Sequence, residues 1–387
     1  MLRTFVTAHS SPPNYLNHFA SSRRSPSKNQ ILPIMASSAR IAVVGDVHDY
    51  WNLKDDSKAL QLLEGSLVAS IRKPKKEIGG KKSEGEGEAR NQTPHLWCVE
   101  HNSYHPTNFP GTRGDFGEEN VELVRSVAEL QMPKAVILGN HDCWWTSKFS
   151  EKDKDRVQLQ LECLGEEHVG YCRLDFPNLK LSVVGGRPFS CGGRNLFRDK
   201  LLVSRYGVHD MEESGKKIYE AALGTPEGHS LVILAHNGPT GLGSKVDDIC
   251  GKDWVRSGGD HGDPDLAQAI SDLKGTTQLH IPLVVFGHMH KELAYEKGLR
   301  KMIVTGDDNI LYLNGAIVPR IKYSTAESNI NSQKDTSSSS PESKGTVRAF
   351  TLVDVLNGEL EKIVETWVSV VGGEAKIEEE TVLYKKQ

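Results

Sequence analysis

Four short clusters of histidine, aspartate and asparagine each follow an apolar run of the sequence, and a fifth cluster contains another aspartate. They are Gly45-Asp46-Val47-His48, Gly139-Asn140-His141-Asp142, His236-Asn237-Gly238, Gly287-His288-Met289-His290 and Gly114-Asp115-Phe116-Gly117. Taken singly, such residues are usually helix caps, turn formers or structural histidines. Taken together, imidazole nitrogens and carboxylate oxygens suit divalent Mn, Fe or Zn. Because cysteine is nearly absent from the clusters, a structural zinc site is disfavoured.

The residues that precede these clusters predict a sheet that could bring them together. β-Branched runs at 41–44, 135–138, 231–234 and 282–286 predict strands, and helical spacing occurs at 55–71, 118–131, 211–222 and 263–274. Further strands are expected near 169–174, 179–184, 302–304, 310–313, 346–354 and 361–369. Apolar strands that alternate with helices indicate an α/β fold. In such sheets the functional loops follow the carboxyl ends of the strands, where the polar clusters lie.

The composition excludes several classes of protein. The chain has 387 residues, 25% of them charged, and a formal net charge of −4. It has no apolar stretch of transmembrane length, and neither its net charge nor any basic track interleaved with aromatics favours nucleic acid as a partner. The 6 cysteines are scattered without a CxxC pair, so a disulfide framework is disfavoured.

Three segments have a composition that does not favour a packed core. Residues 1–39 are basic, serine-rich and free of acidic residues, which is typical of a transit peptide. We expect import into a chloroplast, with a mitochondrion as the alternative, or a cytosolic protein if translation starts at Met35. Residues 72–94 and 324–345 are low-complexity insertions. The expected main domain is 40–323, and strands within 346–387 complete it.

The order GDxH, GD, GNHD, H and GHxH resembles the calcineurin-like metallophosphoesterase superfamily over roughly residues 40–320. The segments GDFGEENVELVRSVAEL and PKAVILGNHDCWW are similar to a branch from cyanobacteria and plastids. The resemblance implies a four-layer α/β/β/α sandwich and an enzyme that hydrolyses a phosphate ester with two divalent metal ions.

The resemblance also implies a role for each residue of the clusters. One metal would be bound by Asp46, His48 and His290, the other by Asn140, His236 and His288, and Asp115 would bridge the two. His141 would act beside the leaving group, with Asp142 orienting it by a hydrogen bond. Asn314 resembles an asparagine that follows a late strand in many members.

Two arginines in glycine-rich loops are candidates for binding the substrate phosphate. Arg187 lies in GGRPFS and Arg194 in CGGRN, and guanidinium groups bind phosphate in a bidentate manner. For either arginine alone, an exposed structural role is the commoner case.

The sequence departs from the family pattern before Asp115. The residues at 102–114 include two prolines and two glycines, which disfavour a central strand. The nearest apolar run is His95–Val99, so the segment from 95 to 114 is either a true loop or an altered transcript. The alternatives to a phosphatase are a phosphodiesterase or nuclease that uses the same site, and a metal-binding scaffold with little turnover.

Overall fold

The computed structural model describes residues 38–47, 51–71, 95–101, 119–150, 153–294, 297–323 and 345–387, and only the backbone of 64–71 and 95–101. His48 and Asp115 therefore lie outside the described residues. So do the predicted transit peptide, apart from residues 38 and 39, and the two predicted insertions, apart from residue 345. All of the described residues belong to one compact unit, Ala36–Gln387.

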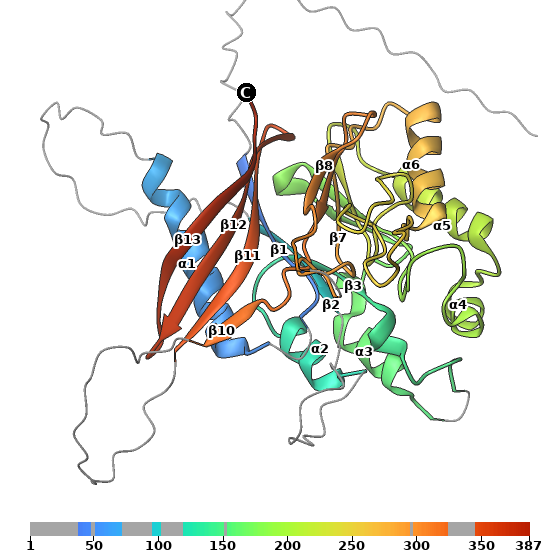
Figure 1. Ribbon diagram of the computed structural model, residues 1–387, viewed down its shortest axis with the longest axis horizontal. Coiled ribbons are helices and arrows are strands. Elements are labelled where there is room, and N and C mark those ends of the chain that lie inside the picture. Colours follow the sequence, from blue (N-terminus) through green and yellow to red (C-terminus); the bar gives the residue numbers. More distant parts are fainter. Residues whose placement is uncertain are drawn as a thin grey trace, which may run out of the picture. The chain divides into compact units, whose positions relative to one another are not determined.

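The first sheet combines three parallel strands with an antiparallel meander (Figure 1). The parallel strands β1 (Ser38–Val44), β2 (His95–His101) and β3 (Lys134–Leu138) lie side by side in this order. On the other side of β1 come β11 (Thr346–Leu356), β12 (Glu359–Val371) and β13 (Glu374–Lys385), each antiparallel to its neighbour. The short β10 (Ile321–Tyr323) pairs with β11.

The second sheet has the order β4-β5-β6-β7-β9-β8. Its parallel core is formed by β5 (Leu181–Gly185), β6 (Ser230–Leu234), β7 (Leu283–Phe286) and β9 (Leu311–Asn314). The strands β4 (Arg173–Phe176) and β8 (Ile303–Thr305) are antiparallel edges. Each core strand is buried along its whole length, as a parallel sheet covered on both faces requires.

Side chains of the two sheets meet in one apolar cluster, and the helices pack in another. Alternate residues such as Ile41 and Val43 of β1 join Val183 of β5 and Val232 of β6 in the first cluster. The intervening residues belong to the second cluster, together with helical side chains such as Leu60. Because side chains alternate across a strand, both faces of these strands are apolar. The fold is therefore α/β with two mixed sheets and helices.

Six α-helices are found among the described residues. They are α1 (Leu53–Ile71), α2 (Val121–Ala128), α3 (Arg156–Leu164), α4 (Asp199–Tyr206), α5 (Met211–Leu223) and α6 (Pro264–Thr276). Side chains of Asn120, Asp155 and Asp210 accept hydrogen bonds from the first-turn amides of α2, α3 and α5. Helix α1 runs beside β12 and β13, and α5 packs against α6 (Figure 1).

The strand expected before Asp115 exists, although it lies early in the sequence. Strand β2 occupies the position between β1 and β3 and is parallel to both. Residues 95–101 are therefore a central strand, whereas 102–118 lie outside the described residues. The sequence did not predict α3, α4 or β13, because the first two are short and weakly apolar and β13 is largely exposed.

Candidate metal centre

The predicted site residues that the structure describes lie at the carboxyl ends of strands from both sheets. Asp46 follows β1 and Asn140 follows β3, while His236 and His288 follow β6 and β7 of the other sheet. Contacts of Asp46 with His290 and of Asn140 with His236 show that the strand ends of the two sheets meet. We call Asp46, Asn140, His236, His288 and His290 the histidine cluster.

Asp46 joins the first sheet to the GHMH loop of the second. Its Oδ2 lies 3.2 Å from His290 Nε2, and its Oδ1 accepts a hydrogen bond of 3.4 Å from the backbone amide of His288. The carboxylate is fully buried. A buried carboxylate beside an imidazole combines two kinds of donor that suit a divalent transition metal.

Asn140 makes the second connection between the sheets. Its Oδ1 lies 2.8 Å from His236 Nε2, and the His236 ring centroid lies 4.9 Å from that of His288. Asn140 and His236 are both buried. The structure thus brings together the three residues that the family resemblance assigns to one metal and two of the three that it assigns to the other.

The backbone of the histidine cluster has unusual conformations. Asp46 has φ +42° and His288 has φ +62°, in the left-handed region that non-glycine residues rarely adopt. Before Asp46, Gly45 passes so close to Gly315 that a Cβ would lie 2.6 Å from the Gly315 carbonyl carbon and oxygen. Glycine is therefore required there, and strained backbone of this kind is often found at functional sites.

Asn314, the last residue of β9, holds the GHMH loop. Its Nδ2 donates a hydrogen bond of 2.6 Å to the Met289 carbonyl, and its Oδ1 accepts one of 2.9 Å from the Ala316 amide. The side chain is buried. Asn314 therefore positions His288 and His290 through the backbone between them.

His141 follows Asn140 in a short 3₁₀ helix, η1 (Asn140–Cys143). Its ring stacks on Trp144 with centroids 4.8 Å apart and planes inclined by 8°. Asp142 Oδ2 accepts a hydrogen bond of 2.8 Å from the Gly139 amide, so this carboxylate shapes the turn that carries Asn140 and His141. The orienting bond from Asp142 to His141 stays a prediction, and stacking on Trp144 is one contact that holds the ring.

Glu119 supports the same turn and was not singled out from the sequence. Its Oε1 accepts hydrogen bonds from the amides of Trp145 (2.9 Å) and Thr146 (2.7 Å), and its backbone oxygen accepts one of 2.8 Å from Arg156 Nε. Burial raises the pKa of Glu119, and these amides partly offset that effect. The GDFGEE segment contains this residue, but nothing in the sequence assigns it to the turn.

His261 is the second residue that sequence patterns did not single out. Its ring stacks 6.0 Å from His288 and lies edge-on to Trp254 at 4.8 Å. It also packs against Gly192, where a Cβ would lie 2.6 Å from the imidazole. His261 lies between Asp260 and Gly262 in the sequence and belongs to none of the motifs, so only the fold reveals its position.

The donor atoms fit a metal centre. His288 is half-buried, and its Nδ1 is buried without a hydrogen-bond partner among the described residues. Burial, followed by the neighbouring His236, lowers the pKa of His288 well below its usual value. A neutral imidazole with a free lone pair is the form that binds a metal. Within the described ranges no group of three His, Cys, Asp or Glu residues is already arranged around a single point, and His48 and Asp115 lie outside these ranges.

The two candidate phosphate-binding arginines have different environments. Arg187 is buried, with its Nε 2.9 Å from Asp265 and an Nη 2.8 Å from Asp263. The prediction for Arg187 is therefore corrected: its guanidinium is already engaged by two carboxylates inside the protein and has a structural role. Arg194 is exposed in the loop next to Gly192 and Gly193, close to His261, so its predicted role stays a prediction.

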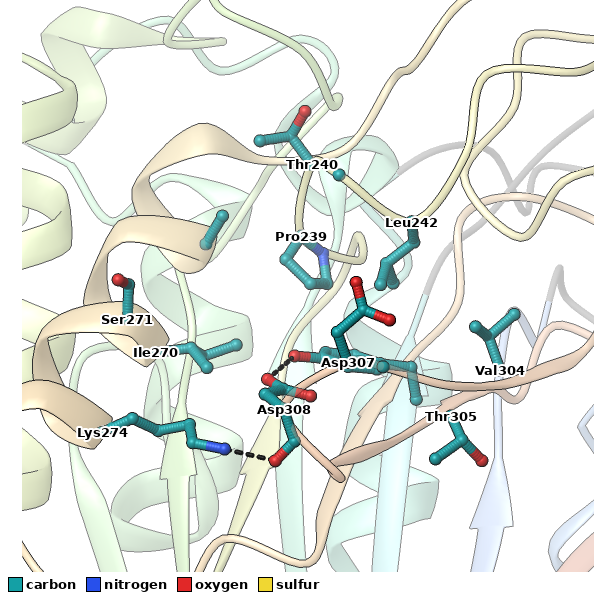
Figure 2. Close-up of a pocket in the computed structure, with 14 residues that line it drawn as sticks. Pro239, Thr240, Leu242, Ile270, Ser271, Lys274, Val304, Thr305, Asp307 and Asp308 are labelled. Atoms are coloured by element: carbon teal, nitrogen blue, oxygen red, sulfur yellow. Dashed lines mark hydrogen bonds between the residues drawn. The ribbon is translucent and has the colours of Figure 1, made fainter.

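A cavity of about 500 Å³ opens beside the histidine cluster, and His141, His288 and His290 line part of it. A different cavity, of about 470 Å³, lies between α6 and the β8–β9 turn (Figure 2). There Tyr312 donates a hydrogen bond of 2.8 Å to Asp308, and Lys274 bonds the Asp308 carbonyl. None of the predicted site residues lines the second cavity, so the first is the candidate substrate site.

Residues 111–292 match the family model of the calcineurin-like phosphoesterase. This segment contains Asn140, His236, His288 and His290, and it supports the superfamily that the motifs indicate. A phosphoesterase domain of this family implies an α/β fold and a metal-dependent hydrolase in general. The model match spans slightly less than half of the chain and begins after Asp46.

Neither curated proteins nor solved structures add to the match with the calcineurin-like phosphoesterase model. No curated protein matches the chain. Among solved structures, one titled "GAP50 the anchor in the inner membrane complex of Plasmodium" is similar at 12% identity and a TM-score of 0.38, over 91% of this chain and 90% of that one. Among the described residues no helix is long and apolar enough to cross a membrane.

Proposed function

We propose that the chain is a metal-dependent phosphoesterase that hydrolyses a phosphate ester at a dinuclear site. The observation that carries this proposal is the meeting of Asp46 and Asn140 with three histidines of the second sheet. His48 and Asp115 complete the proposed ligand set. The proposed fold is the four-layer α/β/β/α sandwich, which the two apolar clusters support.

The proposed metals are Mn, Fe or Zn, because these ions accept mixed imidazole and carboxylate ligands. When bound, two such ions supply positive charge at the phosphoryl oxygens and activate water. Asp46, His48 and His290 would hold one ion, and Asn140, His236 and His288 the other, with Asp115 between them.

His141 is proposed to give a proton to the departing oxygen of the ester. It lines the cavity beside the cluster, and its Nδ1 is buried, which leaves Nε2 as the nitrogen that faces substrate. Stacking on Trp144 holds the ring in this orientation. A positioned general acid of this kind typically contributes about 10²–10⁴-fold to the rate.

The experiment that tests the proposal combines metal analysis with hydrolysis of aryl phosphate mono- and diesters. Purified protein is expected to hold up to about two transition ions per chain, as two-metal sites do, and to hydrolyse at least one ester class. Complete chelation should abolish hydrolysis, and added Mn²⁺ should restore it. Hydrolysis that is unchanged after complete metal removal would contradict the proposal, while bound metal without turnover on either ester class would favour the scaffold alternative. A preference for diesters would favour the phosphodiesterase alternative.

We also propose that residues up to about 35–40 direct import into a plastid and are then removed, because their composition is that of a transit peptide. A fluorescent fusion of residues 1–45 should enter chloroplasts. A fusion that stays diffuse in the cytosol would contradict this proposal.

A further inference from the structure

The cavity beside the histidine cluster has one wall that the phosphoryl chemistry does not use. Besides His141, His288 and His290, apolar groups of Trp254, Leu293, Met289, Val318 and Pro319 line it. Trp254 is 45% exposed. A large indole left exposed at a cavity mouth offers a stacking surface to a planar group.

Two carboxylates and one arginine are the charged side chains that line this cavity. Arg300 lines it, but its side chain is fully buried and already engaged: Nε donates to the His290 carbonyl at 2.9 Å and Nη1 to the Gly251 carbonyl at 2.7 Å. Asp253 is held by Arg300 at 3.2 Å and by the Ala294 amide at 2.8 Å. Glu292 is exposed, and its carboxylate makes no bond to any described residue.

The position of Trp254 relative to the cluster is fixed through His261. The Trp254 and His261 rings are 4.8 Å apart at 86°, and His261 lies 6.0 Å from His288. The backbone oxygen of His261 is held by Asn237 Nδ2 at 2.8 Å and by the Gly193 amide at 2.9 Å. The indole is therefore two ring contacts away from the proposed metal ligand His288, and His261 is a positioning residue for it.

We propose that this cavity binds the organic group of the ester and selects an uncharged aromatic group that stacks on Trp254. This inference rests on the proposed phosphoesterase function and names its substrate class. An anionic organic group would meet the Glu292 carboxylate without a free cation from the described residues. A polyol would find few free hydrogen-bonding side chains on a wall formed by Trp254, Leu293, Val318 and Pro319.

The test compares three monoesters with the metal-loaded full chain. Benzyl phosphate and ethyl phosphate release alcohols of similar basicity, so a difference in kcat/KM between them reports binding of the organic group. Phosphoglycolate carries an extra carboxylate. We expect kcat/KM to fall in the order benzyl phosphate, ethyl phosphate, phosphoglycolate.

Two pairs of variants assign the preference to residues. Trp254→Ala should lower kcat/KM for benzyl phosphate roughly tenfold and leave ethyl phosphate nearly unchanged. Trp145→Ala removes an indole that is 73% exposed and does not line the cavity. It should therefore change kcat/KM for neither benzyl phosphate nor ethyl phosphate. Glu292→Lys should raise kcat/KM for phosphoglycolate roughly two- to fivefold, whereas Glu227→Lys, at an exposed position before β6, should not.

Calorimetric binding of benzylphosphonate gives a readout without turnover. If no ester is hydrolysed but benzylphosphonate binds in a Trp254-dependent manner, the proposed function fails and the assignment of the cavity stands. The inference is overturned, while the proposed function stands, if esters are hydrolysed without a preference for aromatic groups. The same holds if Trp254→Ala lowers kcat/KM equally for benzyl phosphate and ethyl phosphate. If Glu292→Lys leaves kcat/KM for phosphoglycolate unchanged, Glu292 does not select against an anionic organic group.

Discussion

Two polar clusters, one buried and one partly buried, lie close together in this protein and differ in how their polar groups are satisfied. The arginine cluster consists of Arg187, Asp263 and Asp265, whose opposite charges lie 2.8–2.9 Å apart. The hydroxyls of Ser190 and Ser214 donate further hydrogen bonds to these two carboxylates. In the histidine cluster, by contrast, His288 Nδ1 has no partner among the described residues.

The two clusters also differ in their backbone conformation, which is unusual only in the histidine cluster. Asp46 and His288 have positive φ values, whereas the three members of the arginine cluster do not. Left-handed backbone in a non-glycine residue costs roughly 1–2 kcal/mol, and a buried polar atom without a partner adds to that cost. The comparison indicates that the arginine cluster stabilises the fold, while the histidine cluster is arranged for a ligand at the expense of stability.

The largest effect is expected from removing a proposed metal ligand. His236→Ala should empty one metal position. It should lower kcat by more than the 10–100-fold that is typical when a residue hydrogen-bonded to a metal ligand is removed. The loss should be similar for all esters, because the whole site depends on the metal. Metal content by mass spectrometry and kcat on two esters check this. Full metal content in this variant would contradict the assignment.

His141→Ala separates chemistry from metal binding within the same turn. It should retain bound metal and lower kcat about 10²–10⁴-fold. The loss should be greatest for esters with poor leaving groups, because an activated aryl leaving group needs less protonation. Stoichiometric loss of metal, or unaltered kcat on every ester, would show that His141 is not the general acid.

Breaking the arginine cluster should affect stability and not the histidines directly. Arg187→Met leaves two buried carboxylates without their cation, which typically costs about 3–5 kcal/mol of unfolding free energy. The matched variant in the other cluster is His288→Asn, since asparagine tolerates a positive φ. It should change the unfolding free energy of the metal-free protein by less than about 1 kcal/mol. Urea unfolding of both variants measures the difference, and equal destabilisation would erase the contrast between the clusters.

Asn314→Ala tests whether the histidine cluster depends on its supporting backbone. Loss of the bonds to Met289 and Ala316 should weaken metal affinity about 10–100-fold, as for other groups that orient ligands. Asn314→Asp keeps the acceptor for Ala316 but not the donor to Met289, and should lie between the wild type and the alanine variant. Metal titration of the three proteins provides the ranking. Equal affinity in all three would mean that Asn314 does not position the loop.

His168 shows how a buried histidine behaves outside the site. Burial lowers its pKa to about 3 from the usual 6.5, and its Nε2 has no partner among the described residues. The folded state therefore keeps it neutral, while the unfolded chain binds a proton below about pH 6.5. Its neutral form supports the fold above that pH, and stability is lost as the pH falls from 6.5 towards 3. At pH 5 the loss is about 2 kcal/mol.

His168→Met should remove that part of the acid sensitivity, which urea unfolding at pH 7 and pH 5 measures. His209→Gln, at an exposed histidine paired with Glu213, serves as the control and should leave the pH dependence nearly unaltered. If His168→Met and the wild type lose the same stability between the two pH values, His168 is not the group responsible. Because His168 lies outside the site, its unpartnered nitrogen also shows that such an atom indicates function only together with its neighbours.

The sequence by itself determined the strands and the residues at their ends. Runs such as Ala135–Leu138 and Leu231–Leu234 are apolar throughout because they are buried on both faces, so they are readable without a structure. Asp46 and Asn140 closely follow such runs of the first sheet, and His236 and His288 closely follow those of the second. Within each sheet, the pairing needs only that parallel strands end at one edge, so that part of the site was predictable. The meeting of the two pairs depends on the packing of the two sheets, which is a tertiary feature.

Only the tertiary structure decided the roles of residues whose neighbours are distant in the chain. Arg187 has the sequence context of a phosphate-binding loop, yet Asp263 and Asp265 engage it from more than 70 residues away. His261 and Glu119 carry no motif, and packing alone brings them to His288 and to the turn after Asn140. The physical reason is that a pattern reports the burial and conformation of its own segment, whereas the partner of a charge or a ring depends on which segments the fold places beside it.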